Sequence, residues 1–445
     1  MPPISNAWPD VEASLNALEP EYADRITSMV AFLKPHFKAI ESYATSLHPA
    51  KFPCRIITDH YTWGQSFAVF ELVFVDGVSW IIRFGMRPMD VYFNTAEQLE
   101  RKILNEVAAL RLVRERTTIP VPYVIAFHPI TSPSNPLGPE FPAFVLMTAM
   151  NGATIEERGI STSGEGDPLQ GDESKRPILL QYLRDIADIH VQLSRITFDS
   201  IGSFVLGKDG RVSIGPGADY GLGPFTSARE YFQLQADAYE KLAEVDAPEG
   251  NDPTSRLKRQ FVALLWRAAI MPLLDERDDK GPFPMRHGDL HNENILVDET
   301  GHIVGVLDWD CAGTVPWEAF AVPTFEVSGD FVDLGYGSRD ERLAVHDAFN
   351  AALREAQDAP IPPSGRTLAE LHNSNAGHVA AYLAYWMFSM ACDYDHTGRA
   401  LHTIMGLDDM DLAFQKYVDA RARGREGLSV LSPALTSSAP AVSVH

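Results

Sequence analysis

This 445-residue chain lacks the features that mark several large classes of protein. It has only three cysteines, Cys54, Cys311 and Cys392, and no C-x-x-C pair, which predicts a reducing compartment and argues against a zinc site. Met1–Asp10 has neither the basic nor the apolar stretch of a signal peptide, and the longest uncharged apolar run, Val379–Cys392, is too short to cross a bilayer. We therefore expect a cytosolic protein without a membrane segment.

Positive charge is also scarce. The chain has 37 Lys and Arg against 60 Asp and Glu, a net charge of −23. Nucleic acids and anionic membranes require a basic patch, so we expect neither as a partner. The negative balance favours a cationic ligand, but it is equally a common route to solubility. A hydrophobic share of 45% is sufficient for large cores in two or three domain-sized units. The sequence does not indicate the oligomeric state.

Three catalytic motifs are missing: G-x-x-x-x-G-K-[ST], H-E-x-x-H and G-x-S-x-G. Their absence argues against a P-loop enzyme, a metalloprotease of that type and an α/β-hydrolase. The chain instead contains His287–Asn294, of the form H-x-D-x-x-x-x-N, and Asp308 follows at short range.

Phosphoryl transfer from ATP needs a carboxylate that orients the attacking hydroxyl and two oxygen ligands that hold Mg²⁺ on the phosphates. The spacing assigns the first role to Asp289 and the second to Asn294 and Asp308. The segment Asp298–Gly301 separates two short apolar runs, which predicts a hairpin that brings Asn294 and Asp308 to the same end. The alternative is that the Asp and Asn residues merely cap turns.

This stretch resembles the aminoglycoside phosphotransferase and choline kinase-like family, whose signature is H-G-D, four further residues, Asn, and then I-D-W-E or a similar run. Residues 308–318 resemble fungal members in particular, and the resemblance covers about residues 50–420. Protein kinases share the fold but usually have Arg where this chain has Gly288. Gly288, and the lack of a D-F-G to A-P-E segment, favour a small-molecule kinase over a protein kinase. The resemblance implies supporting roles for His287 and His291.

The resemblance implies an α+β, bilobal protein-kinase-like fold, with a small antiparallel β-sheet lobe and a larger, mostly helical lobe. Asp76-Gly77 lies between two apolar runs, which predicts a β-hairpin. A helix over 95–116 and strands at 123–127 and 144–148 are expected to complete the small lobe. Helical periodicity further predicts helices within residues 10–45, 182–195, 227–245, 255–274, 341–355, 368–393 and 407–422.

These patterns divide the chain into four parts. We expect a helical extension at 1–48, a nucleotide-binding lobe at 49–150, a lobe with the catalytic loop and acceptor site at 151–423, and a disordered tail at 424–445. Residues 159–177, rich in Gly, Ser, Asp and Glu, are predicted to form an exposed insertion or mobile loop.

Nucleotide phosphates in kinases are held by a strand cation that pairs with a helix carboxylate. Arg83 and Glu106 are the candidates, because Glu106 lies beside the apolar stripe of the predicted helix and an ionised Glu there needs a partner. Family members commonly have Lys at the position of Arg83. The alternative is a structural ion pair without phosphate contact.

Two further segments are assigned to the nucleotide. Thr62 and Ser66, in a loop with one glycine, are expected to contact phosphate, although an ordinary hairpin turn explains the same pattern. The backbone near Thr148 and Met150 resembles the linker strand that bonds adenine in the family. Core packing is the alternative for the apolar residues around it.

The acceptor is predicted to be a hydroxyl of a small molecule that binds in the helical lobe. Acidic and aromatic side chains there suit an amine through charge and cation–π contact, although any one of them is more simply a surface charge or a core aromatic. The candidates are Glu318, Glu326, Asp330, Asp393, Asp395, Asp408, Asp409, Trp317, Trp386, Phe388 and Tyr394. A catalytically silent, kinase-like binding or scaffold protein is the competing hypothesis, motivated by Arg83 and the glycine-poor loop.

Overall fold

The computed structural model describes residues 4–87, 95–162, 166–207, 209–218, 221–242, 253–321, 342–357, 361–384 and 409–423, and the single residues 327, 359, 398, 401 and 405. The chain forms two compact units. Unit 1 comprises Met1–Gly159, Gly202–Leu222 and His287–Gly313, and unit 2 comprises Ile160–Ile201, Gly223–Arg286 and Thr314–His445. The predicted α+β class is confirmed. The predicted functional lobes, divided at residue 150, stay a prediction.

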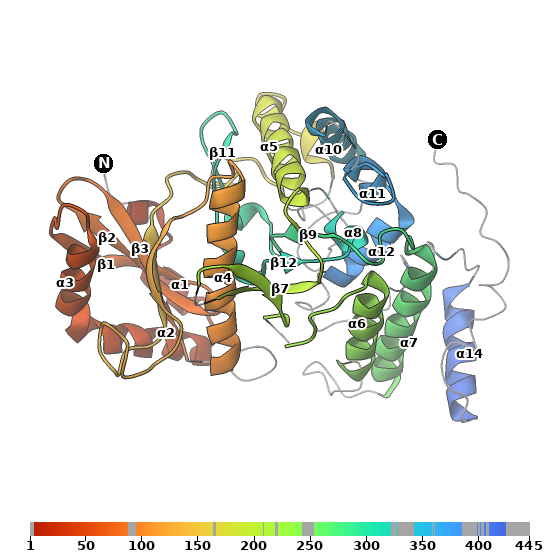
Figure 1. Cartoon of the computed structure of the whole chain (residues 1–445), viewed down its shortest axis with the longest axis horizontal. Coiled ribbons are helices and arrows are strands. Elements are labelled where there is room, and N and C mark those ends of the chain that lie inside the picture. Colours follow the sequence, from red (N-terminus) through yellow and green to blue (C-terminus); the bar gives the residue numbers. More distant parts are fainter. Residues whose placement is uncertain are drawn as a thin grey trace. The chain divides into compact units, whose positions relative to one another are not determined.

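Unit 1 is built on a five-stranded antiparallel sheet of order β1-β2-β3-β5-β4 (Figure 1). The strands are β1 (Cys54–Trp63), β2 (Phe67–Phe74), β3 (Ser79–Gly85), β4 (Val124–His128) and β5 (Phe144–Thr148). Asp76 and Gly77 turn the chain between β2 and β3 as predicted, and Gly77 has the positive φ of 85° that this turn requires.

Helices cover both faces of this sheet. They are η1 (Ile4–Ala7), α1 (Val11–Asn16), α2 (Pro20–Leu33), η2 (Lys34–His36), α3 (Phe37–Leu47) and α4 (Ala96–Arg116). On β5, Phe144 and Leu146 pack in one cluster with α2 and α3, whereas Val145 and Met147 pack with α4. Successive side chains of a strand point to opposite faces, so the first helices cover one face and α4 covers the other.

The rest of unit 1 comes from two later parts of the chain. An antiparallel hairpin that the sequence did not predict consists of β7 (Gly202–Leu206) and β8 (Val212–Gly215). The second part contains η5 (Asn292–Asn294), β10 (Ile295–Val297), β11 (Ile303–Val306) and η6 (Trp309–Cys311), and β12 (Gly313–Thr314) follows at the boundary of the unit. The predicted H-G-D segment therefore belongs to the same compact unit as the large sheet.

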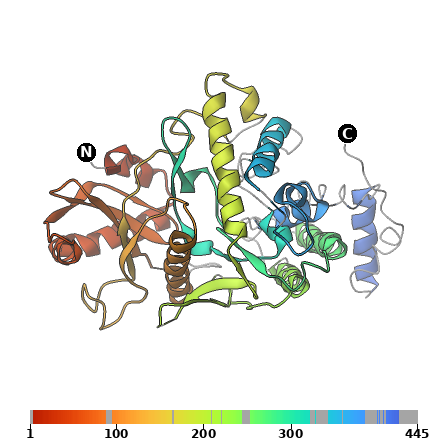
Figure 2. The ribbon, with the colours of Figure 1, turned by 45° about the horizontal axis from the view of Figure 1, so that its top comes forward.

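Unit 2 is mostly helical. Its elements are η3 (Pro168–Gln170), α5 (Arg176–Ser194), β6 (Thr197–Phe198), α6 (Ala228–Leu242), α7 (Pro253–Ile270), η4 (Met271–Leu273), β9 (Phe283–Arg286), α8 (Trp317–Phe320), α10 (Leu343–Ala356), α11 (Leu368–His372), α12 (Asn375–Ala384) and α14 (Met410–Ala422). Helices α5 and α10 lie side by side, as do α6 and α7 (Figures 1 and 2).

The segment predicted to be helical over 368–393 is helical in its described part, where it forms two helices. Thr367 begins α11 with a capping box, and the chain turns at Asn373 and Ser374. The hydroxyl of Ser374 accepts a hydrogen bond from the backbone N–H of Gly377 at 3.0 Å. Ser favours such caps over a helix interior, which accounts for the interruption. Residues 385–393 lie outside the described part, as does the predicted disordered tail.

The segment 159–177, predicted as an exposed insertion or mobile loop, is exposed at most of its described residues, including 170–174, but it is anchored by a few others. Ile160, Thr162 and Leu169 are buried. Asp167 accepts hydrogen bonds from the backbone N–H groups of Ala344, at 2.6 Å, and of Val345, at the start of α10. A carboxylate satisfies the otherwise unpaired N–H groups of a helix start, so this polar segment serves as a cap within unit 2.

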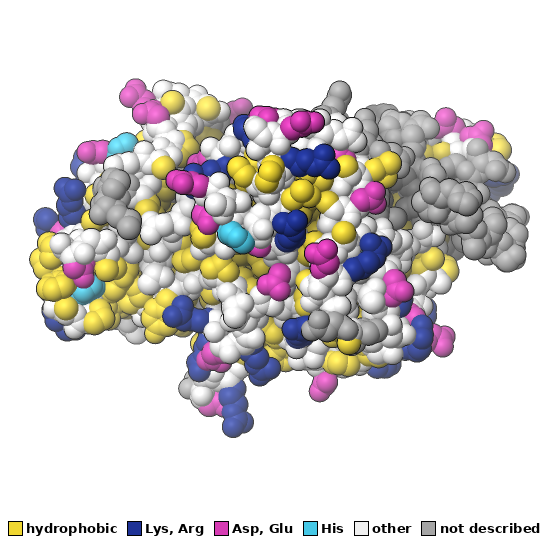
Figure 3. Space-filling view, turned by 90° about the horizontal axis from the view of Figure 1, so that it is seen from above, with side chains coloured by type: hydrophobic (Ala, Val, Ile, Leu, Met, Phe, Trp, Pro, Cys, Tyr) yellow, Lys and Arg dark blue, Asp and Glu magenta, His cyan; other side chains and the backbone are white. Residues whose placement is uncertain are grey.

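Two surface properties bear on the predicted partners. In the part of the chain that the structure describes, no helix has the length and apolarity to span a membrane. On the face shown in Figure 3, Lys and Arg side chains are interspersed with Asp and Glu. This face therefore displays both signs of charge.

Candidate functional site

The predicted hairpin forms and joins the two candidate metal ligands at one end. Strands β10 and β11 pair antiparallel, with Ile295 opposite Val306. The backbone N–H of Leu307 donates to the carbonyl of Asn294 at 2.8 Å, so Asn294 and Asp308 leave the ribbon at the same end. This arrangement was expected from the turn between the two apolar runs.

His287 is buried, at 1% exposure, and holds the H-G-D loop in place. Its Nε2 lies 2.8 Å from the Leu307 carbonyl and therefore donates to it, which leaves Nδ1 to accept from the Asp289 N–H at 3.2 Å. Burial lowers the pKa of His287 to about 4, even though the Asp289 carboxylate favours the charged form. A neutral imidazole with both nitrogens bonded fits a supporting residue.

Asp289 has neighbours at both its backbone carbonyl and its side-chain carboxylate. The Nδ2 of Asn294 donates to the Asp289 carbonyl at 2.9 Å, and His291 Nε2 lies 3.5 Å from the Asp289 carboxylate. Burial disfavours the carboxylate, but hydrogen bonding to His291 and the charges of His291, His287 and Lys102 together hold the pKa of Asp289 below its usual value. Asp289 is therefore ionised at neutral pH.

Gly288 meets two constraints that a larger residue does not. Its φ is 91°, in the left-handed region, and a Cβ on it would lie 2.1 Å from the carbonyl oxygen of Cys311. The H-G-D loop thus approaches the backbone after Asp308 so closely that only glycine fits without a shift.

Asp308 also has a left-handed backbone, with φ 58° and ψ 67°. Such a conformation costs an L-residue roughly 1–2 kcal/mol. Its buried Oδ1 has no hydrogen-bond partner in the described part of the chain, and Arg83 Nη1 lies 3.5 Å away. Burial and the neighbouring Asp310 carboxylate raise the pKa of Asp308 to about 6, against the attraction of Arg83.

The structure joins Arg83 and Glu106, as the sequence predicted. Arg83 extends from the centre of β3, with its Cζ 4.5 Å from the Phe67 ring centroid, and its Nη2 bonds the carboxylate of Glu106 on α4. Burial raises the pKa of Glu106, and the guanidinium of Arg83 opposes that rise. Since Arg83 also lies beside Asp308, the pair is part of the site.

Two residues of α4 that the sequence reasoning missed complete this cluster. Lys102 Nζ lies 3.4 Å from the Asp310 carboxylate. Asn105 is buried, and its Nδ2 donates to the carbonyls of Asp310, at 2.8 Å, and Ala312, at 2.7 Å. Its Oδ1 accepts from the Phe204 N–H at 2.6 Å. Asn105 thus fixes the segment after Asp308 to α4 and to β7.

The candidate phosphate loop is a tight connection between β1 and β2. The backbone N–H of Gly64 donates to the carbonyl of Phe67 at 3.0 Å, and the carbonyl of Ser66 accepts from the backbone N–H of Met86 at 2.9 Å. Thr62 is in register with Val69, which is in turn in register with Arg83. Thr62 and Ser66 therefore flank a turn near the Arg83 strand, and their contact with phosphate stays a prediction.

The predicted adenine linker follows β5. The backbone N–H of Thr148 donates to the Tyr123 carbonyl, and its hydroxyl accepts from the Tyr123 N–H, both at 2.9 Å. These groups are engaged within the sheet, which leaves Met150 as the better candidate for adenine. Met150 lies against the β10–β11 hairpin. A Cβ added to Gly305 of β11 would be 3.3 Å from the Cβ of Met150.

The described acceptor candidates lie in unit 2 and have structural partners. Trp317 is fully buried, and Glu318 is 1% exposed with Arg366 Nη2 at 3.3 Å. Asp409 caps α14 through the Leu412 N–H at 2.9 Å. The other candidates lie outside the described residues: Glu326, Asp330, Trp386, Phe388, Asp393, Tyr394, Asp395 and Asp408.

Comparison with known proteins identifies the family. The model of the phosphotransferase enzyme family matches residues 60–318, more than half of the chain, and this chain belongs to that family. The members of that family are phosphotransferase enzymes. No curated protein matches this chain.

Several solved structures are similar. Macrolide 2′-phosphotransferase MphH from Brachybacterium faecium is 16% identical, with 84% of this chain and 99% of that chain covered and a TM-score of 0.43. A thermostable aminoglycoside phosphotransferase APH(4)-Ia, in a ternary complex with AMP-PNP and hygromycin B, is 16% identical, with coverages of 86% and 90% and a TM-score of 0.41. The GDP complex of a mutant aminoglycoside 2′-phosphotransferase-IIIa is 13% identical, with coverages of 82% and 90% and a TM-score of 0.42.

Proposed function

We propose that this chain transfers the γ-phosphate of ATP to a hydroxyl of a small molecule. The observation that carries the proposal is the packing of the H-G-D loop and Asp308 at one end of the hairpin, with the Arg83–Glu106 pair beside Asp308. Phosphoryl transfer depends almost entirely on positioning and on charge stabilisation, and this cluster supplies the residue types for both.

In this proposal Asp289 orients the acceptor hydroxyl and receives its proton. The acceptor oxygen forms a bond to the γ-phosphorus, and the bond from that phosphorus to the oxygen bridging to the β-phosphate breaks. The lowered pKa of Asp289 supports this role, because the base is ionised before the reaction begins. His287 positions Asp289 and stays neutral.

The residues also suit Mg²⁺, which the family implies. Asp308 has a buried oxygen without a hydrogen-bond partner in the described chain, and Asn294 directs its Nδ2 to the Asp289 carbonyl, which leaves its Oδ1 as a ligand. No group of three His, Cys, Asp or Glu among the described residues forms a metal site. Mg²⁺ usually takes one or two carboxylates and completes its shell with phosphate and water. When bound, it would neutralise phosphate charge.

We assign the remaining nucleotide contacts to residues on or beside the strands of the five-stranded sheet. We assign the α- and β-phosphates to Arg83, held by Glu106, and the covering loop to Thr62 and Ser66. The adenine is assigned to the backbone at Met150, since the Thr148 N–H is already bonded. We propose a small-molecule acceptor, and the net charge of −23 favours a cationic one. The cytosolic location stays a prediction.

One observation favours the competing scaffold function. Arg83 replaces the usual Lys, and its Nη atoms already face Glu106 and Asp308. In a silent protein these contacts would be purely structural, no phosphoryl transfer would occur, and we would expect no Mg²⁺-dependent nucleotide binding.

Calorimetry of Mg²⁺·ATP binding tests the proposal. We expect metal-dependent binding that is lost in Asp308→Ala and retained in Glu299→Gln, an exposed acidic residue on the turn of the same hairpin. Asp289→Asn should bind nucleotide normally while transfer to a panel of amino alcohols and aminoglycosides falls about 10²–10⁴-fold. Absence of nucleotide binding by the folded wild type would favour the scaffold. Parallel titrations with GTP establish the nucleotide preference.

A further inference from the structure

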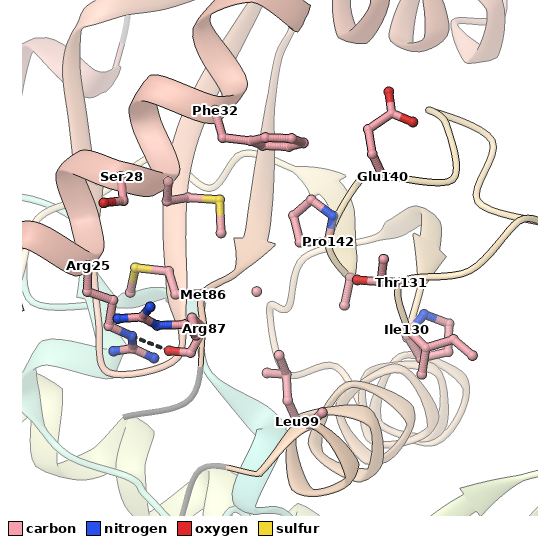
Figure 4. Close-up of a pocket in the computed structure, with 15 residues that line it drawn as sticks. Arg25, Ser28, Phe32, Met86, Arg87, Leu99, Ile130, Thr131, Glu140 and Pro142 are labelled. Carbon is pink, nitrogen blue, oxygen red and sulfur yellow. Dashed lines mark hydrogen bonds between the residues drawn. The ribbon is translucent and has the colours of Figure 1, made fainter. Parts of the chain in front are cut away.

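Unit 1 contains a cavity that no part of the proposed reaction uses. Its volume is about 510 Å³, within the range of roughly 300–1,000 Å³ that is usual for ligand pockets. It lies between α2, the end of β3, the start of α4 and the loops flanking β4 and β5 (Figure 4). Asp289, Asn294 and Asp308 do not line it.

Most of the wall is apolar and adaptable. Met29 and Phe32 of α2, Met86 after β3 and Leu99 of α4 contribute long side chains. Methionine side chains accommodate irregular apolar shapes, because they are unbranched and polarisable. Gly85, which also lines the cavity, brings no side chain to fill it. The wall therefore suits a flexible apolar body.

One end of the cavity is basic. Arg25 is only 5% exposed, its Nη1 donates to the Gln65 carbonyl at 2.6 Å, and its Nε donates to the Arg87 carbonyl. Among the described residues no carboxylate pairs with Arg25, and burial lowers its pKa, with the charge of Arg87 acting in the same direction. A buried cation without a counter-ion is costly, and an anion offsets that cost.

We propose that this cavity binds an amphiphilic monocarboxylate, with its head on Arg25 and Arg87 and its apolar body against Met29, Phe32 and Leu99. A planar carboxylate matches the fork of a guanidinium. Glu140 lines the cavity across from the arginines (Figure 4), so a second anionic group at the far end of the ligand is disfavoured.

The site is connected to the candidate phosphate loop. Gln65, whose carbonyl Arg25 holds, lies in the turn between β1 and β2, and Arg87 follows β3. A carboxylate that fixes the Arg25 guanidinium also fixes this turn, which lowers the ordering cost of nucleotide binding. This coupling rests on the proposed function, whereas carboxylate binding itself does not.

Calorimetry with decanoate, below the concentration at which it forms micelles, tests the binding site. We expect one decanoate per chain, about tenfold weaker binding in Arg87→Gln, and a similar weakening when decanol replaces decanoate, because each removes a charge-assisted contact. Ser28→Trp places an indole in the cavity and should abolish binding. Thr27→Trp, on the adjacent exposed position of α2, should bind decanoate as the wild type does.

Two results would overturn the binding site: no decanoate binding by the wild type, or equal binding by Ser28→Trp. Equal affinity for decanol would refute the role of the arginines. The coupling is tested by titrating Mg²⁺·ATP with and without saturating decanoate, where we expect several-fold tighter nucleotide binding and, by reciprocity, the same factor for decanoate. Unchanged nucleotide affinity in a protein that binds both ligands would refute the coupling alone.

Discussion

Asn105→Ala is the sharpest test of how the site is held together. The substitution removes the donor for the carbonyls of Asp310 and Ala312 and the acceptor for the Phe204 N–H, at 2.8, 2.7 and 2.6 Å. Asn105 is 1% exposed, so solvent does not replace these partners. Three backbone groups from two distant segments are left without their bonds.

The expected loss of stability follows from these contacts. An unsatisfied buried backbone group costs about 1–3 kcal/mol, so three cost roughly 3–6 kcal/mol if some relaxation is allowed. Alanine is a better helix former than asparagine by up to about 0.7 kcal/mol, which offsets part of the loss. We therefore expect the free energy of unfolding to fall by about 3–5 kcal/mol. Asn105→Asp should be worse, because a carboxylate would face two carbonyl oxygens.

Urea unfolding, followed by tryptophan fluorescence, measures this loss. Arg111→Ala is the matched control, because Arg111 lies on the same helix and makes an exposed ion pair with Glu115 that is worth about 0.3–0.5 kcal/mol. Asn105→Ala should also weaken Mg²⁺·ATP binding, since the segment after Asp308 is no longer fixed to α4. A loss below about 1 kcal/mol, or one equal to that of the control, would refute the reasoning.

Three further changes test neighbouring parts of the site. Gly288→Ala should lower the free energy of unfolding in urea by several kcal/mol. The control Gly77→Ala has a similar φ of 85°, but its added Cβ would have no atom within 4 Å, so it should cost only about 1–2 kcal/mol. Equal losses in the two variants would contradict the close approach of Gly288 to Cys311. Arg83→Met leaves Glu106 buried and unpaired, so about 3–5 kcal/mol should be lost at pH 8, and less at pH 5, where Glu106 can protonate. His287 has a pKa of about 4 in the folded chain and 6.5 when unfolded. The stability that neutral His287 contributes is therefore complete above pH 6.5, and about 3 kcal/mol of it is lost as the pH falls to 4. His287→Gln should flatten this dependence of unfolding free energy on pH, and an unchanged pH profile would refute the prediction.

Local patterns predicted much of the site. The spacing of Asp289, Asn294 and Asp308, with a turn between two apolar runs, was sufficient to predict that the two candidate metal ligands meet at one end of a hairpin. Helical periodicity placed Glu106 beside the buried stripe of α4, where an ionised carboxylate requires a cation, and Arg83 is that cation. In both cases the physical constraint acts within a few residues or along one face of an element.

Other parts depended on distant partners. Asn105 forms hydrogen bonds with residues about 100 and 200 positions later in the chain, and no local sequence pattern predicts these partners. A signal was nevertheless present, because Lys102, Asn105 and Glu106 are polar residues at helical spacing on a largely buried helix. The polar composition of 159–177 indicated its exposure but not the capping role of Asp167, because the helix that Asp167 caps begins far away in the sequence.

The discontinuity of unit 1 has a consequence for the order of events during synthesis. The sheet, α4 and Arg83 have been made when the chain reaches Gly159, but the loop with Asp289 and the hairpin that delivers Asp308 end only near Gly313. At about 5–20 residues per second, the ribosome needs roughly 8–30 s to make this intervening stretch. Throughout that interval Asn105 lacks the carbonyls of Asp310 and Ala312, and Arg83 lacks the neighbouring Asp308, because those residues have not yet been made. Nascent chains released before that point would therefore carry an incomplete unit 1, and such fragments are natural substrates for chaperones and proteases.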